Sequence, residues 1–242
     1  MKFEADDPRR RTLLQWLAAG AFGGASLGSQ EVLAQLLGAP PSRLPQGRSV
    51  YRISGEVQVD GKRATLDTPI SGGAVVETAR NSEIVYVVGE SAYIAREATK
   101  VIVETSQPSS PIVTGLKLLQ GKLLSVFPSR RPVQMSTQVA SIGIRGTGVY
   151  MESDPGQTYF CTCYGVTDVA SLKDPQSKDT IAATHHDKPV YVLADQPAGR
   201  AIRPAPFVNH TDQELMLIET LVGRQPPFVF PKSDYTGPRR NY

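Results

Sequence analysis

Short apolar segments separated by turn residues fill the chain between residues 49 and 195, and this pattern limits what it can fold into. The segments recur about every ten residues, which leaves no room for helices between them. Asp60-Gly61 and Asp154-Pro155-Gly156 stand at two of the breaks, and these residue types tolerate the backbone angles of tight turns. Gln120-Gly121 marks a third predicted hairpin. The pattern predicts an all-β fold, a single sandwich-like or roll-like domain of many short strands.

The expected strands are short and follow one another closely. They cover residues 50–59, 62–66, 74–78, 84–88, 93–96, 101–104, 116–119, 122–127, 132–140, 142–144, 148–152, 158–164, 166–172 and 189–193.

One helix is expected, at residues 212–222 near the C-terminus. Thr211 and Glu214 have the spacing of a capping box, in which each side chain binds the other residue's backbone N–H. Gly223 supplies the residue that usually ends a helix. The apolar residues lie on one helical face, which we expect to pack on the sheet: Leu215, Ile218, Leu221 and Val222.

The first 34 residues have the parts of an export signal. Arg10 and Arg11 are followed by Thr-Leu-Leu and a weakly apolar stretch, which resembles a twin-arginine signal. Cleavage after Ala34 is expected, because signal cleavage needs small residues just before the cut. The apolar run is also shorter than the ~20 residues of a spanning helix. We therefore expect a periplasmic protein. Retention as a membrane anchor and an ordinary amphipathic helix are the alternatives.

The sequence thus divides into four predicted parts. They are a signal segment at 1–34, a linker at 35–48, a β domain at 49–195 and a C-terminal extension at 196–242 that contains the helix.

The charge of the chain argues against nucleic-acid binding. The formal net charge is only +3, and no stripe of Lys and Arg with interleaved aromatic residues is present. We expect a periplasmic or envelope protein as partner, and membrane contact only through an uncleaved signal segment.

Four sequence pieces, taken in order, resemble the FecR domain family over about residues 50–152. They are Gly-Glu-Val-Gln-Val-Asp-Gly-Lys-Arg-Ala at 55–64, Gly-Ala-Val-Val-Glu-Thr at 73–78, Leu-Leu-Gln-Gly-Lys-Leu at 118–123, and Ala-Ser-Ile-Gly-Ile-Arg-Gly-Thr-Gly at 140–148. The resemblance implies a periplasmic β domain that binds partners and often relays a signal across the inner membrane. No cytoplasmic anti-sigma region precedes the signal segment, so we expect a binding domain rather than a regulator of iron uptake.

The closing piece of this resemblance contains Arg145, Gly146 and Thr147. Its glycines run Gly-x-x-Gly-x-Gly and lead into a predicted strand, which is not the dinucleotide-binding pattern. We expect Arg145 to be buried at a sharp bend and bonded to backbone carbonyls. A contact with an anion is the alternative.

Every cysteine and histidine of the chain lies between residues 161 and 210. Cys161 and Cys163 are two residues apart, so on a strand their thiols share a face with Cα atoms about 6.6 to 7 Å apart. That separation is at the limit for a disulfide but is compatible with two ligands of one metal. With His185, His186 and His210 they predict a candidate site for Zn, Cu or Fe.

Structural roles for the same residues compete with the metal site. Buried cysteines often act as small apolar residues. His185 and His186 are adjacent, so on a strand they would face opposite ways and could not both bind one ion. His210 precedes the helix, where it could help to cap it.

Catalysis by a thiol is the weakest of the functional interpretations. It needs a base beside the thiolate and a group that orients the base, for which Asp187 and Asp212 are candidates. The sequence contains no phosphate loop, no paired carboxylates at a meaningful spacing and no serine elbow. We therefore expect a non-catalytic exported FecR-like domain that binds a protein or envelope ligand. A metal-binding or redox-sensing version is the first alternative, and a thiol enzyme is the second.

Overall fold

The computed structural model describes residues 41–107 and 110–228. The predicted signal with Arg10 and Arg11, its cleavage site and residues 35–40 of the predicted linker lie outside this part. Within it, no helix has both the length and the apolar character needed to cross a membrane.

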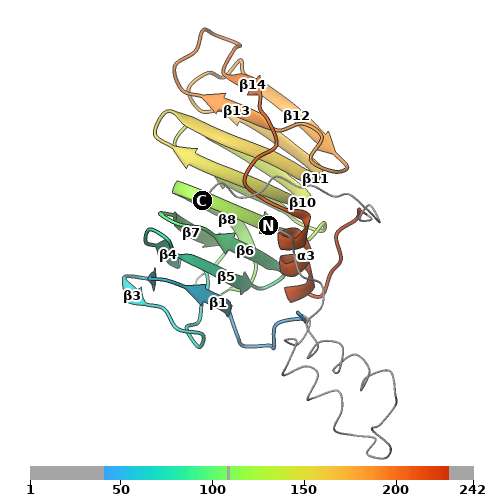
Figure 1. Cartoon of the computed structure of the whole chain (residues 1–242). Coiled ribbons are helices and arrows are strands. Elements are labelled where there is room, and N and C mark those ends of the chain that lie inside the picture. Colours follow the sequence, from blue (N-terminus) through green and yellow to red (C-terminus); the bar gives the residue numbers. More distant parts are fainter. Residues whose placement is uncertain (1–40, 108–109, 229–242) are drawn as a thin grey trace, which may run out of the picture. The chain divides into compact units, whose positions relative to one another are not determined.

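The described residues form the predicted all-β fold, with one α-helix near the C-terminus (Figure 1). All strands belong to one sheet that is not closed into a barrel. The strands are β1 (Val50–Ser54), β2 (Val57–Val59), β3 (Lys62–Arg63), β4 (Val75–Thr78), β5 (Glu83–Val88), β6 (Ser91–Ala95), β7 (Lys100–Thr105), β8 (Val113–Val126), β9 (Pro132–Ser136), β10 (Ala140–Asp154), β11 (Gln157–Ser171), β12 (Lys178–Ala183), β13 (Val190–Leu193) and β14 (Ile202–Pro204). The helix is α3 (Asp212–Leu221).

The long strand β8 connects two arms of the sheet. The first part of β8 pairs with β7, which leads on through β4 to β2 and β3. The second part of β8 pairs with β6, which leads on to β5 and β1. An open sheet therefore folds over a core without closing on itself.

The predicted hairpin at Gln120-Gly121 is wrong, because β8 runs through both residues without reversing. Gly121 has φ of 91°, and any side chain there would overlap the backbone of Thr99. The glycine thus bends β8 at the point where its pairing partner changes from β7 to β6, and the chain does not turn back there.

The other two predicted hairpins are confirmed. Asp60 and Gly61 both have positive φ, 53° and 73°, and join β2 to β3. β10 and β11 pair antiparallel out to Asp154 opposite Gln157. β11 is one strand where two were predicted, since Gly165 (φ 94°) bends it without ending it. The short strands β12 and β14 were not predicted.

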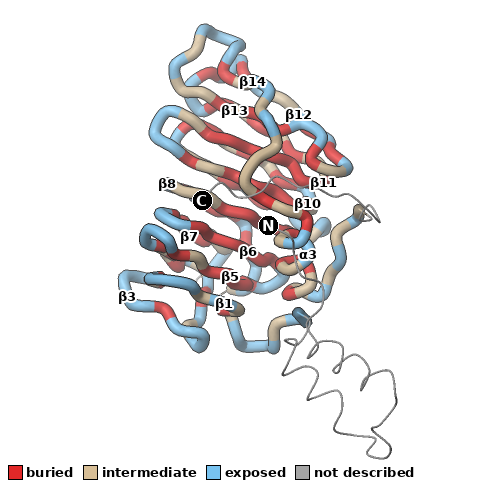
Figure 2. The backbone as a smooth tube through the Cα atoms, viewed as in Figure 1, coloured by how far each residue is buried: buried red, intermediate tan, exposed pale blue. Residues whose placement is uncertain are grey.

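The arm that contains β5 has an apolar surface on both faces. Along β5, Ile84 and Tyr86 belong to the core between the arms, whereas Val85 and Val87 belong to a second cluster beneath α3. In Figure 2, β5 and β6 are coloured as buried along most of their length, and exposed residues lie at the turns. This second face requires a cover, and α3 supplies it.

The helix α3 agrees with its prediction. The Thr211 hydroxyl accepts from the Glu214 backbone N–H, and the Glu214 carboxylate accepts from the Thr211 backbone N–H. Gly223, just beyond the C-terminal end of the helix, has φ of 74°. Leu215, Ile218 and Leu221 are buried in the second cluster.

Arg145 is not buried, contrary to the sequence prediction. Its side chain is 65% exposed and forms an ion pair with Asp168 on β11 instead of binding backbone carbonyls. The next residue, Gly146, has φ of 58° and lies against the backbone of Ser129. The glycine therefore makes the bend, and the arginine projects outward from it. Thr147 is buried, and the carbonyls of Gly148 and Tyr164 are both within reach of the single hydrogen of its hydroxyl.

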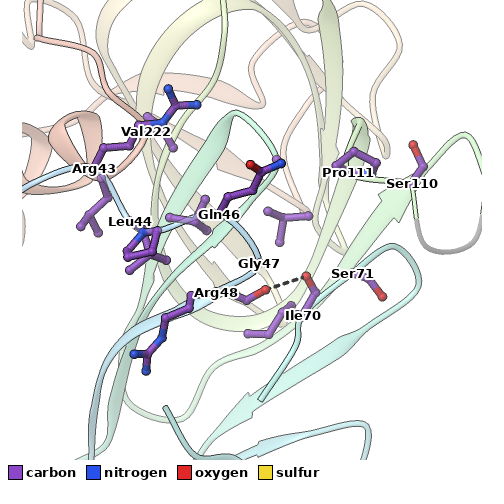
Figure 3. A pocket seen from close by; sticks show the side chains of 16 residues that line it. Arg43, Leu44, Gln46, Gly47, Arg48, Ile70, Ser71, Ser110, Pro111 and Val222 are labelled. Carbon is purple, nitrogen blue, oxygen red and sulfur yellow. Dashed lines mark hydrogen bonds between the residues drawn. The ribbon is translucent and has the colours of Figure 1, made fainter. Parts of the chain in front are cut away.

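A cavity of about 890 Å³ lies beside the C-terminal end of α3 (Figure 3). It is lined by residues 43–49, 70–71, 87–89, 110–111 and 221–222. No cysteine or histidine lines it, so it is separate from the candidate site described next.

Candidate metal centre

Cys161 and Cys163 lie on β11 with both side chains on the face toward α3. Both are free thiols with no exposed surface, and both belong to the cluster beneath the helix. Phe160, which directly precedes Cys161, points the other way, into the core between the arms. The predicted common face of the two thiols is therefore confirmed.

His186 reaches these thiols from the turn after β12. Its backbone N–H donates to the Cys163 carbonyl at 2.9 Å, and its φ of 54° is in the left-handed region. Its Nδ1 lies 3.5 Å from the Cys161 sulfur. His185 and His186 lie in a turn and not on a strand, so the opposite orientation that a strand would impose does not apply, and both side chains reach Asp212.

His210 approaches from the segment that leads into α3. Its Nε2 lies 3.1 Å from Nδ1 of His186. Its ring stacks on Tyr150 with centroids 4.5 Å apart, and its Nδ1 lies 2.7 Å from the Val208 carbonyl. Thr211, not His210, caps the helix.

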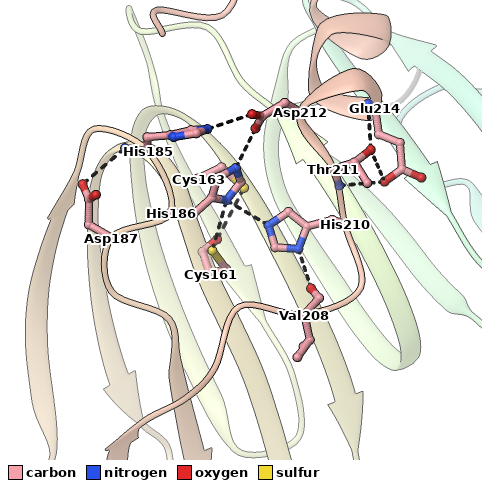
Figure 4. A network of polar contacts seen from close by, with 10 residues as sticks. All are labelled: Cys161, Cys163, His185, His186, Asp187, Val208, His210, Thr211, Asp212 and Glu214. Carbon is pink, nitrogen blue, oxygen red and sulfur yellow. Dashed lines mark hydrogen bonds and ion pairs between the residues drawn. The ribbon is translucent and has the colours of Figure 1, made fainter. Parts of the chain in front are cut away.

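Four donor atoms thus converge in one buried place (Figure 4). The sulfurs of Cys161 and Cys163 and one nitrogen each of His186 and His210 all lie within 4.8 Å of one another. A tetrahedral zinc ion with two sulfur and two nitrogen ligands places its ligand atoms about 3.3 to 3.8 Å apart, from the usual bond lengths. Small shifts of these side chains would therefore complete the coordination of one ion.

Asp212 orients the imidazoles of His185 and His186 through hydrogen bonds. It is fully buried at the first position of α3, and its two carboxylate oxygens lie 3.0 Å from Nε2 of His186 and 2.8 Å from Nε2 of His185. A hydrogen bond from Nε2 of His186 to this carboxylate leaves its Nδ1 facing the thiols. The Val208 carbonyl does the same for His210, whose Nε2 then faces His186. Metal-binding histidines usually have such partners.

His185 is the one predicted ligand that does not join the four. Its side chain is 34% exposed, and it binds Asp212 with its ring 4.6 Å from that of Phe228. The structure therefore separates the five predicted residues into four converging donors and His185, which shares Asp212 with His186 and has its ring 4.9 Å from that of His186. Asp187 caps its own turn, where it accepts from the Thr184 and His185 backbones.

The surroundings favour charge separation within the cluster. Burial opposes ionisation of Cys161, but contacts with Cys163, His186 and His210 outweigh it and hold the pKa of this thiol well below its usual range. Burial and the neighbouring Cys161 raise the pKa of Cys163. Burial lowers the pKa of His186, but Cys161 and Asp212 outweigh this effect and raise it. The cluster is thus a place where sulfur can carry negative charge.

The sequence indicated Asp212 only as a possible partner in catalysis, and no pattern in it pointed to Tyr150 or Phe207. Phe207 packs on both His186 and His210, with ring centroids 4.3 and 4.6 Å away. Tyr150 comes from β10 and bonds Glu152 through its hydroxyl at 2.6 Å. Nothing in the local sequence connects these aromatic residues with the histidines, because only the fold brings them together.

Comparison with known proteins gives few matches. No family model matches the sequence, and no curated protein matches it. Two crystal structures of a candidate anti-sigma factor from Parabacteroides distasonis are similar at 11% identity and a TM-score of 0.43. Each match covers 54% of this chain and 58% of the other, so the chain spans little more than half the length of that protein.

Proposed function

We propose that this protein is an exported, non-catalytic β domain that binds one zinc ion through Cys161, Cys163, His186 and His210. The observation that carries the proposal is the convergence of four buried sulfur and nitrogen donors from three separate chain segments. The two histidines, His186 and His210, each have a hydrogen-bond partner at one ring nitrogen, which leaves the other nitrogen facing the site.

Zinc suits this donor set better than the other two metals considered. Two thiolates and two imidazoles in a tetrahedral arrangement are typical of zinc or iron–sulfur centres, whereas copper(II) prefers a square-planar or tetragonal site. The four donors lie within 4.8 Å of one another, which suits one ion better than a cluster with two irons. Four protein ligands fill a tetrahedral shell, which is the arrangement of structural rather than catalytic zinc.

The burial of the thiols supports a non-catalytic role. A thiol enzyme needs a nucleophile that substrate can reach, but Cys161 and Cys163 have no exposed surface and do not line the cavity of Figure 3. The same burial, and their i, i+2 placement on a strand, disfavour a disulfide in an oxidising compartment.

Export and the partner remain part of the proposal. The twin-arginine-type segment suits a metal protein, because that route carries folded proteins and the ion can be inserted before export. The FecR-like pattern at residues 50–152 supports a protein or envelope partner in the periplasm, with the zinc site serving to shape the domain that binds it.

Elemental analysis of the full chain, purified without a histidine tag, tests the proposal. We expect close to one zinc per chain in the wild type and in His185→Ala, and almost none in a Cys161→Ser/Cys163→Ser double variant. His185→Ala is the matched control, since His185 contacts Asp212 like His186 but lies outside the four donors. A folded wild-type protein without metal, after incubation with zinc, would refute the proposal.

A further inference from the structure

The helix α3 is attached to the sheet differently at its two ends. At its N-terminal end, His210 directly precedes the cap Thr211, and Asp212 contacts His185 and His186. At its C-terminal end, Glu219 binds Tyr164 and Arg224. Only the N-terminal attachment passes through the candidate metal centre.

The four donors are divided between the sheet and the helix segment. Cys161 and Cys163 belong to β11, and His186 to the turn whose backbone N–H binds Cys163. His210 belongs to the segment that enters α3. An ion bound to all four would therefore join this segment to the sheet.

Without an ion, hydrogen bonds and ion pairs provide the polar attachment of that end of the helix: Asp212 binds His185 and His186, and Asn209 binds Glu152. His210 keeps its neighbour His186 and the Val208 carbonyl of its own segment. Arg96 on the sheet side forms a largely buried ion pair with Glu214 at 2.8 Å. The two imidazoles would keep hydrogen-bond partners, whereas the two thiols would have only weak sulfur contacts, at 3.5 Å to His186 and 3.9 Å to the Cys161 carbonyl. An ion would therefore supply the strongest link between β11 and the segment that enters α3.

The helix has little stability of its own. It has ten residues, and isolated helices shorter than about 12 to 15 residues are marginal in water. It stays helical because its apolar face packs on the cluster beneath it. Docking and helix formation are thus one event, and a loss of docking melts the helix.

We infer that the bound ion locks α3 onto the sheet, so that loss of the ion releases the segment around α3 while the rest of the sheet stays folded. This inference rests on the proposed zinc site and adds its regulation. The core between the arms contains neither α3 nor any of the four donors, so it does not depend on the ion. Release would expose the second apolar face, which includes Val85, Val87, Ile94, Leu124, Val126 and Tyr150.

Hydrogen exchange followed by mass spectrometry on the full chain tests the inference. Each sample is measured as purified, after treatment with a zinc chelator and after zinc is restored, and its zinc content is determined in parallel. We expect at least tenfold faster exchange across 211–221 in the zinc-free sample, with β4 and β7 unchanged and protection restored by zinc. Cys161→Ser/Cys163→Ser should match the zinc-free sample, and His185→Ala should respond to zinc like the wild type.

The outcomes separate this inference from the proposed function. Zinc that binds and leaves without any change in exchange across 211–221 would overturn the lock and leave the zinc site intact. Loss of protection in β4 and β7 as well would also overturn it, because the ion would then hold the whole domain together. A wild-type protein that takes up no zinc would refute the proposed site itself.

Discussion

Nε2 of His186 lies 3.0 Å from Oδ1 of Asp212, and neither side chain is appreciably exposed. This pair connects the turn after β12 to the first residue of α3. A carboxylate in that position selects the imidazole tautomer whose Nδ1 is free to bind metal. It therefore joins the chemistry of the site to the placement of the helix.

Asp212→Asn should weaken zinc binding without removing a ligand. The amide keeps the shape of the carboxylate but loses its charge and turns one N–H₂ group toward an imidazole N–H. Loss of such a partner typically costs 10- to 100-fold in metal affinity. Competition with a chromophoric chelator measures the effect. Asp179→Asn, which removes an exposed pair with Lys188, is the control and should leave affinity unchanged.

Ile218→Ala should destabilise the protein through the packing of α3. The side chain is fully buried in the cluster beneath the helix, and truncation of a buried isoleucine to alanine costs about 2 to 5 kcal/mol. Urea denaturation of the zinc-loaded protein measures the loss. Met216, on the same helix but 39% exposed, gives the control Met216→Ala, which should change stability by no more than about 0.5 kcal/mol. Equal losses in the two variants would contradict the docked face described for α3.

Gly146→Ala tests the bend in β10. The residue has φ of 58°, and a methyl group there would overlap the backbone of Ser129. Left-handed backbone strain alone costs about 1 to 2 kcal/mol for alanine, and the displaced neighbour adds to it. Gly156→Ala is the matched control, because a methyl group at that turn meets no atom within 4 Å. Thermal unfolding should show a clear decrease for the first variant and little change for the second.

The fold could be predicted where sequence and local geometry agree. Alternating apolar residues and Asp60-Gly61 identified strands and a hairpin, and the capping box at Thr211 located the helix. Two of the failures occur where a glycine can either end a strand or bend it. Gly121 and Gly165 were interpreted as breaks, but both bend a continuous strand that pairs with different neighbours along its length.

The candidate site could be predicted only in part. The i, i+2 spacing fixed the common face of Cys161 and Cys163, since every strand has that alternation. Which of His185 and His186 would join them depends on a left-handed residue in a turn, and no local pattern specified it. The roles of Tyr150 and Asp212 depend on contacts between segments far apart in the sequence.

Asp168→Asn should lower the thermal stability of the domain at neutral pH but much less at acid pH. The hydrogen bond from Thr180 and the ion pair with Arg145 lower the pKa of the Asp168 carboxyl below its usual value. A carboxyl with a lowered folded-state pKa stabilises the fold above its unfolded pKa of about 3.9, and this contribution is lost as pH falls through the folded value. The variant should therefore unfold at a lower temperature than the wild type at pH 7, by a small margin because both partners are partly exposed. The difference should shrink below about pH 4, in thermal scans followed by circular dichroism.

Asp154→Asn, at an exposed turn, should show no such pH-dependent difference. A gap for Asp168→Asn that stays constant down to acid pH would show that the side chain acts through packing rather than through its charge.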